Sequence, residues 1–97
     1  MAMFGRWVHS REEDSGGAQV YRRPDYRFPP SRGRTGFEIR EDGTFIAIGI
    51  GPADGKKARR GRWRQPDDRQ LHVTYDDGEE QTLRILDVGD DVLRLAT

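Results

Sequence analysis

Two Asp-Gly pairs, Asp42-Gly43 and Asp77-Gly78, each separate two stretches in which apolar and polar residues alternate. An Asp-Gly pair between alternating runs is the strongest short-range signal of a β-hairpin, because it suits the positive φ angles of a tight turn. Further turn signals, rich in Pro, Gly and Asp, stand at residues 52–55, 66–68 and 89–91. The spacing predicts six consecutive strands from about residue 36 to the C-terminus.

A further strand is predicted at the N-terminus, in the stretch MFGRWVH. No stretch shows a convincing helical period, and turns this short make neighbouring strands antiparallel. The expected fold is therefore all-β, a small antiparallel up-and-down meander that closes into a barrel or half-barrel of 7 to 8 strands. Residues 1–97 are expected to form one domain with a long proline-containing loop at about 10–35.

Strand parity predicts which side chains fill the interior, because alternate residues of a strand face the same side. The expected core consists of the apolar residues of one parity: Phe37, Ile39, Leu71, Val73, Tyr75, Leu83, Ile85, Leu93 and Leu95. The strand at 45–51, FIAIGIG, is apolar on both sides. Its outer side therefore needs a cover, either from the 10–35 segment or from another subunit.

The basic stretch 56–64, KKARRGRWR, raises the question of nucleic-acid binding. Parity places Arg60, Arg62 and Arg64 on the outer face and directs Trp63 inward. Residues 1–64 carry 14 Lys and Arg against 8 Asp and Glu, and residues 65–97 carry 3 against 9. We therefore expect the arginines to pair with acidic residues of adjacent strands. Nucleic acid is a disfavoured partner, because single-stranded sites combine such a ridge with several exposed aromatics.

Several other classes of site find no support in the sequence. The absence of cysteine excludes disulfides and thiolate metal ligands, and two isolated histidines are no coordination motif, so no metal or cofactor is predicted. Ser10 follows His9 directly, and adjacent strand residues face opposite sides, so the two cannot form a catalytic dyad. No catalytic residue is predicted. The absence of cysteine favours a cytoplasmic protein, and the lack of a long apolar run predicts no membrane association.

The pair Gly5-x-Trp7 resembles the Gly-x-Trp signature of lipocalins. Together with GFEIREDGTF, GRW, VTYDDG and VLRL, it makes the chain similar over most of its length to small bacterial lipocalin-like proteins, although it is shorter and lacks their C-terminal helix. The resemblance implies an antiparallel barrel closed at one end by Trp7. It also implies that Arg94, on the last strand, packs across the tryptophan ring.

The first expectation for function is a non-catalytic binding module. It would hold a small, partly apolar or anionic molecule at the barrel mouth, under the 10–35 loop. The loop offers aromatic groups and cationic donors beside a flexible glycine, and the barrel offers a tryptophan. The predicted ligand contacts are Tyr26, Phe28, Arg32, Arg34 and Trp63.

Two alternatives stay open on the sequence. One is a protein-interaction or accessory module, a homodimer among its forms, that uses the strand at 45–51 and the basic strand at 56–64. The other is an isomerase- or cyclase-type enzyme in which a barrel cavity shapes a substrate. Fold alone does not choose between them, because small barrels carry many unrelated functions.

Overall fold

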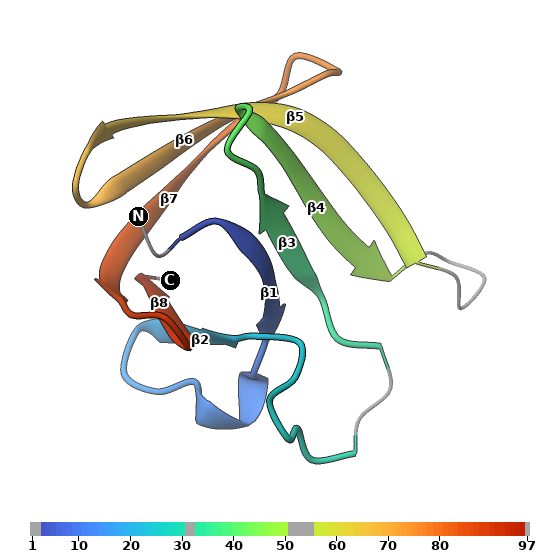
Figure 1. Cartoon of the computed structure of the whole chain (residues 1–97), viewed down its shortest axis with the longest axis vertical. Helices are drawn as coiled ribbons and strands as arrows, with labels where there is room; N and C mark the ends of the chain where they lie inside the picture. Colours follow the sequence, from blue (N-terminus) through green and yellow to red (C-terminus); the bar gives the residue numbers. More distant parts are fainter. Residues whose placement is uncertain (1–2, 31–32, 51–55, 97) are drawn as a thin grey trace.

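The computed structural model describes residues 3–30, 33–50 and 56–96. These residues form eight strands and one turn of 3-10 helix (Figure 1). In chain order the elements are β1 (Gly5–His9), η1 (Arg11–Glu13), β2 (Ala18–Arg22), β3 (Gly36–Ile39), β4 (Thr44–Ile50), β5 (Lys56–Asp67), β6 (Gln70–Tyr75), β7 (Glu80–Val88) and β8 (Val92–Ala96). No helix among the described residues is long and apolar enough to cross a membrane.

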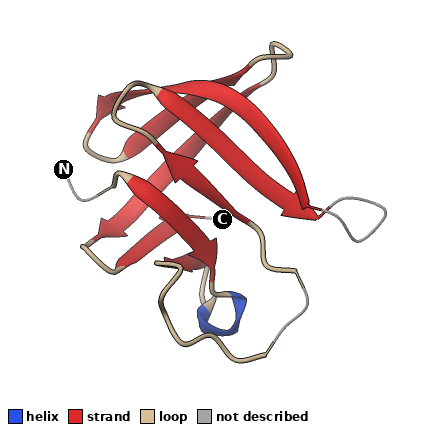
Figure 2. Ribbon diagram, turned by 45° about the vertical axis from the view of Figure 1, so that its right-hand side comes forward, coloured by secondary structure: helices blue, strands red, loops and turns tan. Residues whose placement is uncertain are grey.

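The strands close into a barrel in which every neighbouring pair is antiparallel, so the predicted fold class is confirmed. β3 to β8 follow one another around the barrel in chain order. The β1–β2 hairpin completes the ring, with β1 beside β3 and β2 beside β8. The connection from β2 to β3 must therefore pass β1, and its described residues, 23–30 and 33–35, run outside the ring of strands (Figure 2).

The eighth strand, β2, lies inside the segment that was predicted to be a loop, and this part of the prediction is wrong. Gln19 pairs with Leu95 and Tyr21 with Leu93, so Gln19 and Tyr21 face the interior. Val20 faces outward, yet it is only 4% exposed. The strand thus places an amide and a phenol inside the barrel, which is the reverse of the apolar-inward alternation by which strands are recognised.

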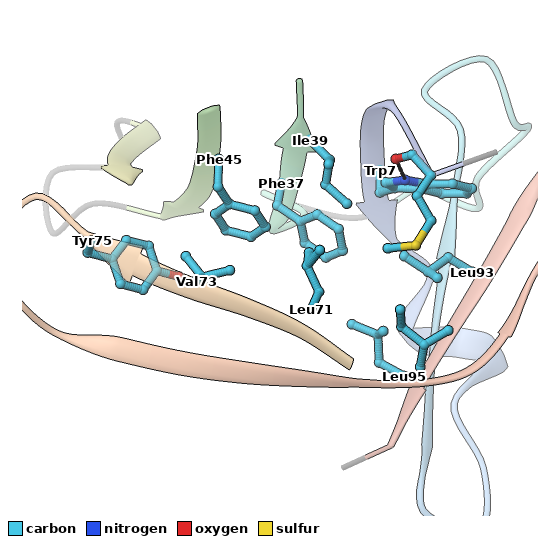
Figure 3. Close-up of a cluster of buried hydrophobic side chains, with 11 residues drawn as sticks. Trp7, Phe37, Ile39, Phe45, Leu71, Val73, Tyr75, Leu93 and Leu95 are labelled. Carbon is cyan, nitrogen blue, oxygen red and sulfur yellow. Dashed lines mark hydrogen bonds between the residues drawn. The ribbon is translucent and has the colours of Figure 1, made fainter. Parts of the chain in front are cut away.

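The core fills one end of the barrel, which we call the closed end. Met3, Trp7, Ile39, Leu71 and Leu93 are almost completely buried there, and they come from the start of the chain, the end of β3 and the beginnings of β6 and β8 (Figure 3). The core expected from parity is confirmed, except that Leu83 is only partly buried. Burial of these side chains is the main favourable contribution to the stability of so small a barrel.

Trp7 seals the closed end, as the lipocalin resemblance implied. Its indole N–H donates to the carbonyl of Met3 at 3.0 Å. The guanidinium that packs on its ring belongs to Arg23, 3.8 Å from the ring centroid, and not to Arg94, which is exposed on β8. Arg23 also donates to the carbonyls of Phe4 and Asp90, and so ties the N-terminal segment to the β7–β8 turn.

The outer face of β4 and β5 differs from the expected arrangement. Across the ladders, Arg60 lies opposite Ile46, Arg62 opposite Thr44 and Thr74, and Arg64 opposite His72. Within the described part of the chain these three exposed arginines form no direct ion pair, so the predicted pairing is not found in that form. Arg60 nevertheless has an acidic neighbour, because its charge contributes to lowering the pKa of Asp42. Ile46 and Ile48 are half-buried, and residues 33–35 of the long connection border Ile48.

Candidate functional site

The end of the barrel opposite Trp7 is hollow, and we call this hollow the mouth cavity. Its volume is about 490 Å³, which falls within the range of small-molecule sites. Its lining comes from β2, from the starts of β3 and β7, from the first half of β4 and from the ends of β6 and β8. The lining residues are Gln19, Tyr21, Gly36, Phe37, Phe45, Ala47, Tyr75, Gln81, Thr82, Leu83, Leu95 and Ala96. All of them are uncharged at neutral pH.

One wall of the mouth cavity is a continuous row of four aromatic rings, which we call the aromatic row. The ring centroids of Tyr21 and Phe37 are 4.8 Å apart, those of Phe37 and Phe45 are 5.4 Å apart, and those of Phe45 and Tyr75 are 6.1 Å apart. These separations are typical of favourable aromatic pairs. Because the row is contributed by four strands, the closed barrel holds its rings in fixed positions.

A phenol stands at each end of the aromatic row, and each phenol meets a carboxamide. The hydroxyl of Tyr75 donates to Gln81 Oε1 at 2.8 Å, and the hydroxyl of Tyr21 donates to Gln19 Oε1 at 3.4 Å. The second contact is long and correspondingly weaker. The polar groups of the mouth cavity are therefore concentrated in two phenol–carboxamide pairs, with two phenylalanine rings between them.

Both phenols are held in the protonated form. Burial, and secondarily the negative charge of Asp14, raise the pKa of Tyr21 to about 12. Burial also raises the pKa of Tyr75, although Arg59 beside it acts in the opposite direction. A phenol with a raised pKa is a neutral hydroxyl over the whole physiological range, so each can donate one hydrogen bond and accept another.

At the rim beside Tyr75, the positive charge of Arg59 is neutralised by two carboxylates. The Arg59 guanidinium lies 4.0 Å from the Tyr75 ring centroid and pairs with Asp77 at 2.9 Å and Glu79 at 3.6 Å. A backbone N–H bond from Glu79 and the charge of Arg59 lower the pKa of Asp77, so its carboxylate persists at neutral pH. Arg59 therefore brings no uncompensated positive charge to the entrance.

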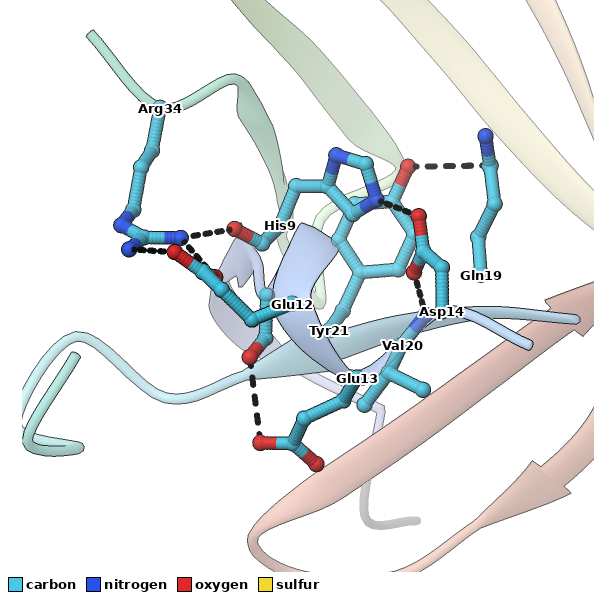
Figure 4. A network of polar contacts seen from close by, with 9 residues as sticks. His9, Glu12, Glu13, Asp14, Gln19, Val20, Tyr21 and Arg34 are labelled. Carbon is cyan, nitrogen blue, oxygen red and sulfur yellow. Dashed lines mark hydrogen bonds and ion pairs between the residues drawn. The ribbon is translucent and has the colours of Figure 1, made fainter. Parts of the chain in front are cut away.

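The rim beside Tyr21 is fixed by Asp14, which follows η1 (Figure 4). One carboxylate oxygen accepts the backbone N–H of Val20 at 2.8 Å, and the other accepts the His9 ring N–H at 2.8 Å. The His9 ring stacks on Tyr21 with centroids 5.0 Å apart. Asp14 thus joins the end of β1 to β2 and holds the first ring of the aromatic row in place.

The predicted loop contacts form a separate cluster on the long connection. Arg34 makes two 2.7 Å bonds to the carboxylate of Glu12 and lies 4.7 Å from the Phe28 ring centroid. Phe28 meets Tyr26 edge to face at 5.0 Å, and Arg22 lies over the Tyr26 ring. Arg34 is the first cause that lowers the pKa of Glu12 to about 2. These contacts anchor the connection on η1 and β2, away from the mouth cavity.

The other two predicted contacts also lie apart from the mouth cavity. Trp63 is half-buried on β5 and packs against Phe4, with centroids 5.9 Å apart and its indole N–H bonded to the carbonyl of Arg40. That position belongs to the closed end. Arg32 lies outside the described residues. The structure therefore does not bring the five predicted contacts together.

Sequence reasoning missed the residues that give the mouth cavity its polarity, Gln19, Tyr21 and Gln81. Gln19 and Tyr21 were missed because β2 was not recognised. Gln81 shares the inward parity of Leu83 and Ile85, since it pairs with Val73, so extending the parity rule by one step would have found it.

The described residues offer little for metal or nucleophilic chemistry. Among them no group of three or more His, Cys, Asp or Glu side chains could hold a metal ion. Ser10 is buried, and its hydroxyl bonds to Glu13 while His9 bonds to Asp14, so serine and histidine belong to different contacts. His72 is bonded to Thr82 and Glu80, on the side of β6 and β7 away from the core.

No protein-family model, curated protein or solved structure matches this chain.

Proposed function

We propose that the chain is a binding module that holds a small, partly apolar and uncharged molecule in the mouth cavity. The observation that carries the proposal is a hollow of about 490 Å³ whose described lining is wholly uncharged and includes four packed aromatic rings. The accessible lining combines apolar side chains with a larger share of uncharged polar groups, and small-molecule sites likewise combine apolar surface with placed polar groups. The closed end supplies a rigid base for the cavity.

The charge of the lining favours a neutral ligand over the anionic one that the sequence suggested. A carboxylate or phosphate that enters the cavity loses water and needs a cationic partner to compensate. Arg34 is bonded to Glu12 outside the cavity, and Arg59 is already paired with Asp77 at the rim. A neutral molecule has no such requirement, and it gains from burial against the aromatic row.

A binding role also explains the cavity better than an isomerase or cyclase role does. The ionisable groups that the described lining contains are Tyr21 and Tyr75, and burial raises the pKa of both. Efficient general acid–base catalysis uses groups with a pKa near the working pH. These phenols are suited to orient a ligand by hydrogen bonds.

The lipocalin-like assignment belongs to the same proposal. An antiparallel eight-stranded barrel, a tryptophan at its closed end and a guanidinium on the indole support it. The strand order is a departure, because β1 lies between β2 and β3 instead of beside β8. The proposed binding function rests on the cavity and does not depend on the family.

A variant that fills the mouth cavity tests the proposal. Ala47 lines the cavity on β4, whereas Ala58 is exposed on β5. The probe is 1-aminoanthracene, an uncharged fluorophore whose emission rises in an apolar site. We expect Ala47→Trp to weaken probe binding at least tenfold and Ala58→Trp to leave it unchanged. If wild-type protein does not bind the probe or other neutral polycyclic molecules, the proposal is refuted.

A second candidate function is supported by the outer face of β4 and β5: docking of an acidic, extended segment of a partner protein. Arg60, Arg62 and Arg64 are exposed in a row beside the half-buried Ile46 and Ile48. Alternate residues of a strand lie about 7 Å apart, and an extended partner segment has the same repeat. The paired neighbours of the arginines are isoleucine, threonine and histidine, and Arg60 also lies near Asp42 and accepts the backbone N–H of Asp76 at its own backbone carbonyl. None of these neighbours offers the aromatic platforms of a nucleic-acid site.

A synthetic peptide of alternating glutamate and valine tests this second function by fluorescence anisotropy. Changing Arg60, Arg62 and Arg64 to Gln should weaken binding at least tenfold. The same change at Arg69, Arg84 and Arg94 removes equal charge elsewhere and should have a small effect. Binding of poly-dT in place of the peptide, or equal effects of the two triple variants, would contradict the proposal.

A further inference from the structure

The two phenol–carboxamide pairs sit at opposite ends of the aromatic row. Tyr21 and Gln19 stand at the β2 end, and Tyr75 and Gln81 stand at the β6–β7 end. Phe37 and Phe45 occupy the middle of the row and are stacked at 22° to one another. The wall of the mouth cavity is therefore polar at both ends and apolar between them, and only small parts of the two buried phenylalanine rings reach the cavity.

The hydrogen bonds within each pair decide which groups remain for a ligand. In both pairs the phenol O–H is the donor and the carboxamide Oε1 is the acceptor. The carboxamide nitrogens, each with two N–H donors, have no recorded partner among the described residues. The phenol oxygens keep a free lone pair. Each end of the row consequently presents N–H donors beside one weaker acceptor.

From this pattern we infer that the mouth cavity binds flat, uncharged molecules that carry a hydroxyl or carbonyl oxygen at each of two opposite ends. The inference rests on the proposed binding function and adds the ligand class. The flat centre of the ligand lies along the wall between the two pairs, which is formed by the half-buried Ala47 and Leu83 and by the small exposed parts of Phe37 and Phe45. Each terminal oxygen accepts from a carboxamide N–H, and a hydroxyl can in addition donate to the phenol oxygen.

The cavity should select a doubly hydroxylated molecule over other molecules of the same shape, because those leave hydrogen-bonding groups or charges without a partner. Gln19 is half-buried and Gln81 is exposed at the mouth. A hydrocarbon of the same shape displaces water from their N–H donors without replacing its hydrogen bonds, which costs free energy where the bound ligand shields the donors from solvent. A dicarboxylate of the same shape supplies acceptors but brings two charges into a cavity whose described lining has no cation. The doubly hydroxylated molecule avoids both penalties.

Two ring scaffolds test the inference by calorimetry and ligand-observed NMR. Naphthalene and biphenyl are each compared as the parent hydrocarbon, as the 2,6- or 4,4′-dihydroxy compound, and as the dicarboxylate substituted at the same positions. On at least one scaffold the dihydroxy compound should bind at least tenfold more tightly than both of its relatives. If the hydrocarbon binds as tightly on both scaffolds, or a dicarboxylate binds best, the ligand class is wrong while the binding function stands. Absence of binding by all six overturns both.

Variants of the carboxamides separate recognition from structural support. Gln19→Leu and Gln81→Leu should each weaken binding of the dihydroxy compound about tenfold while preserving or improving binding of the hydrocarbon. Gln70→Leu makes the same change at an exposed position on β6 and should alter neither. Equal loss of affinity for hydrocarbon and diol in the Gln19 and Gln81 variants would mean that the carboxamides only support the fold, and would refute the inference.

Discussion

At the scale of single residues, the closed end depends on a position where a side chain has no room. A Cβ on Gly5 would lie 2.9 Å from Arg23 Nη1, and the backbone φ of Gly5 is +110°, a value that other residues rarely adopt. The glycine allows the guanidinium of Arg23 to reach Trp7 and the carbonyl of Phe4. The Gly-x-Trp pattern thus has a physical cause in this chain.

Gly5→Ala should therefore destabilise the protein by about 1 kcal/mol more than Gly78→Ala does. Gly78 is the matched control because its φ is +90° and nothing lies near its added Cβ. Urea unfolding of both variants measures the difference. In an Arg23→Ala background the excess should disappear. Equal effects of the two substitutions in the wild-type background would show that Arg23 is not confined by Gly5.

Tyr21 provides a pH-dependent test of burial at the mouth. Its pKa is raised to about 12 from the usual 10, so the folded state holds the proton more tightly than the unfolded state does. The resulting stabilisation is present below pH 10 and is lost as the pH rises towards 12, by an amount on the order of 2 kcal/mol. Absorbance titration should show that Tyr21→Phe removes the last tyrosine to ionise. Persistence of that step in the variant would place the buried phenol elsewhere.

At the scale of elements, the strands with an apolar interior face could be predicted from sequence and β2 could not. Alternation of apolar and polar residues predicts the strands that contain Phe37 and Ile39 or Leu71 and Val73. In β2 the inward positions line a cavity and are Gln19 and Tyr21, so the usual signal is reversed. Because these inward residues are polar, the sequence also did not predict the candidate site that they line. Prediction failed at the mouth because the lining of a cavity does not obey the pattern of a filled core.

The contact between β1 and β3 offers an element-scale prediction. A Cβ on Gly36 would collide with the backbone carbonyl of Trp7, and backbone cannot move aside as a flexible side chain can. Gly36→Ala should therefore separate the two strands at this point and cost about 3 kcal/mol or more. Gly16→Ala, where nothing lies near the added Cβ, is the control in the same urea experiment. A cost below that of the control would mean that the β1–β3 ladder is not formed as described.

At the scale of the whole molecule, barrel closure divides the protein into two ends with different roles. The end containing Trp7 and Leu71 is filled and provides stability, whereas the end lined by Gln19, Tyr21 and Gln81 is hollow and is where we propose that a ligand binds. Turn signals and parity could predict the meander from β3 to β8. They could not predict that β1 lies between β2 and β3, because strand neighbours so far apart in sequence leave no local signal.

The central claim is that binding occurs at the mouth cavity and not on the long connection. Titration of ¹⁵N-labelled protein with 4,4′-dihydroxybiphenyl and 2,6-dihydroxynaphthalene, followed by amide chemical shifts, tests it most directly. Saturable shifts at Gly36, Ala47, Gln81 and Ala96, with little change around Tyr26 and Trp63, are the predicted result. Shifts concentrated at Tyr26, Phe28 and Arg34, or at the closed end, or no shifts with either compound, would contradict the account.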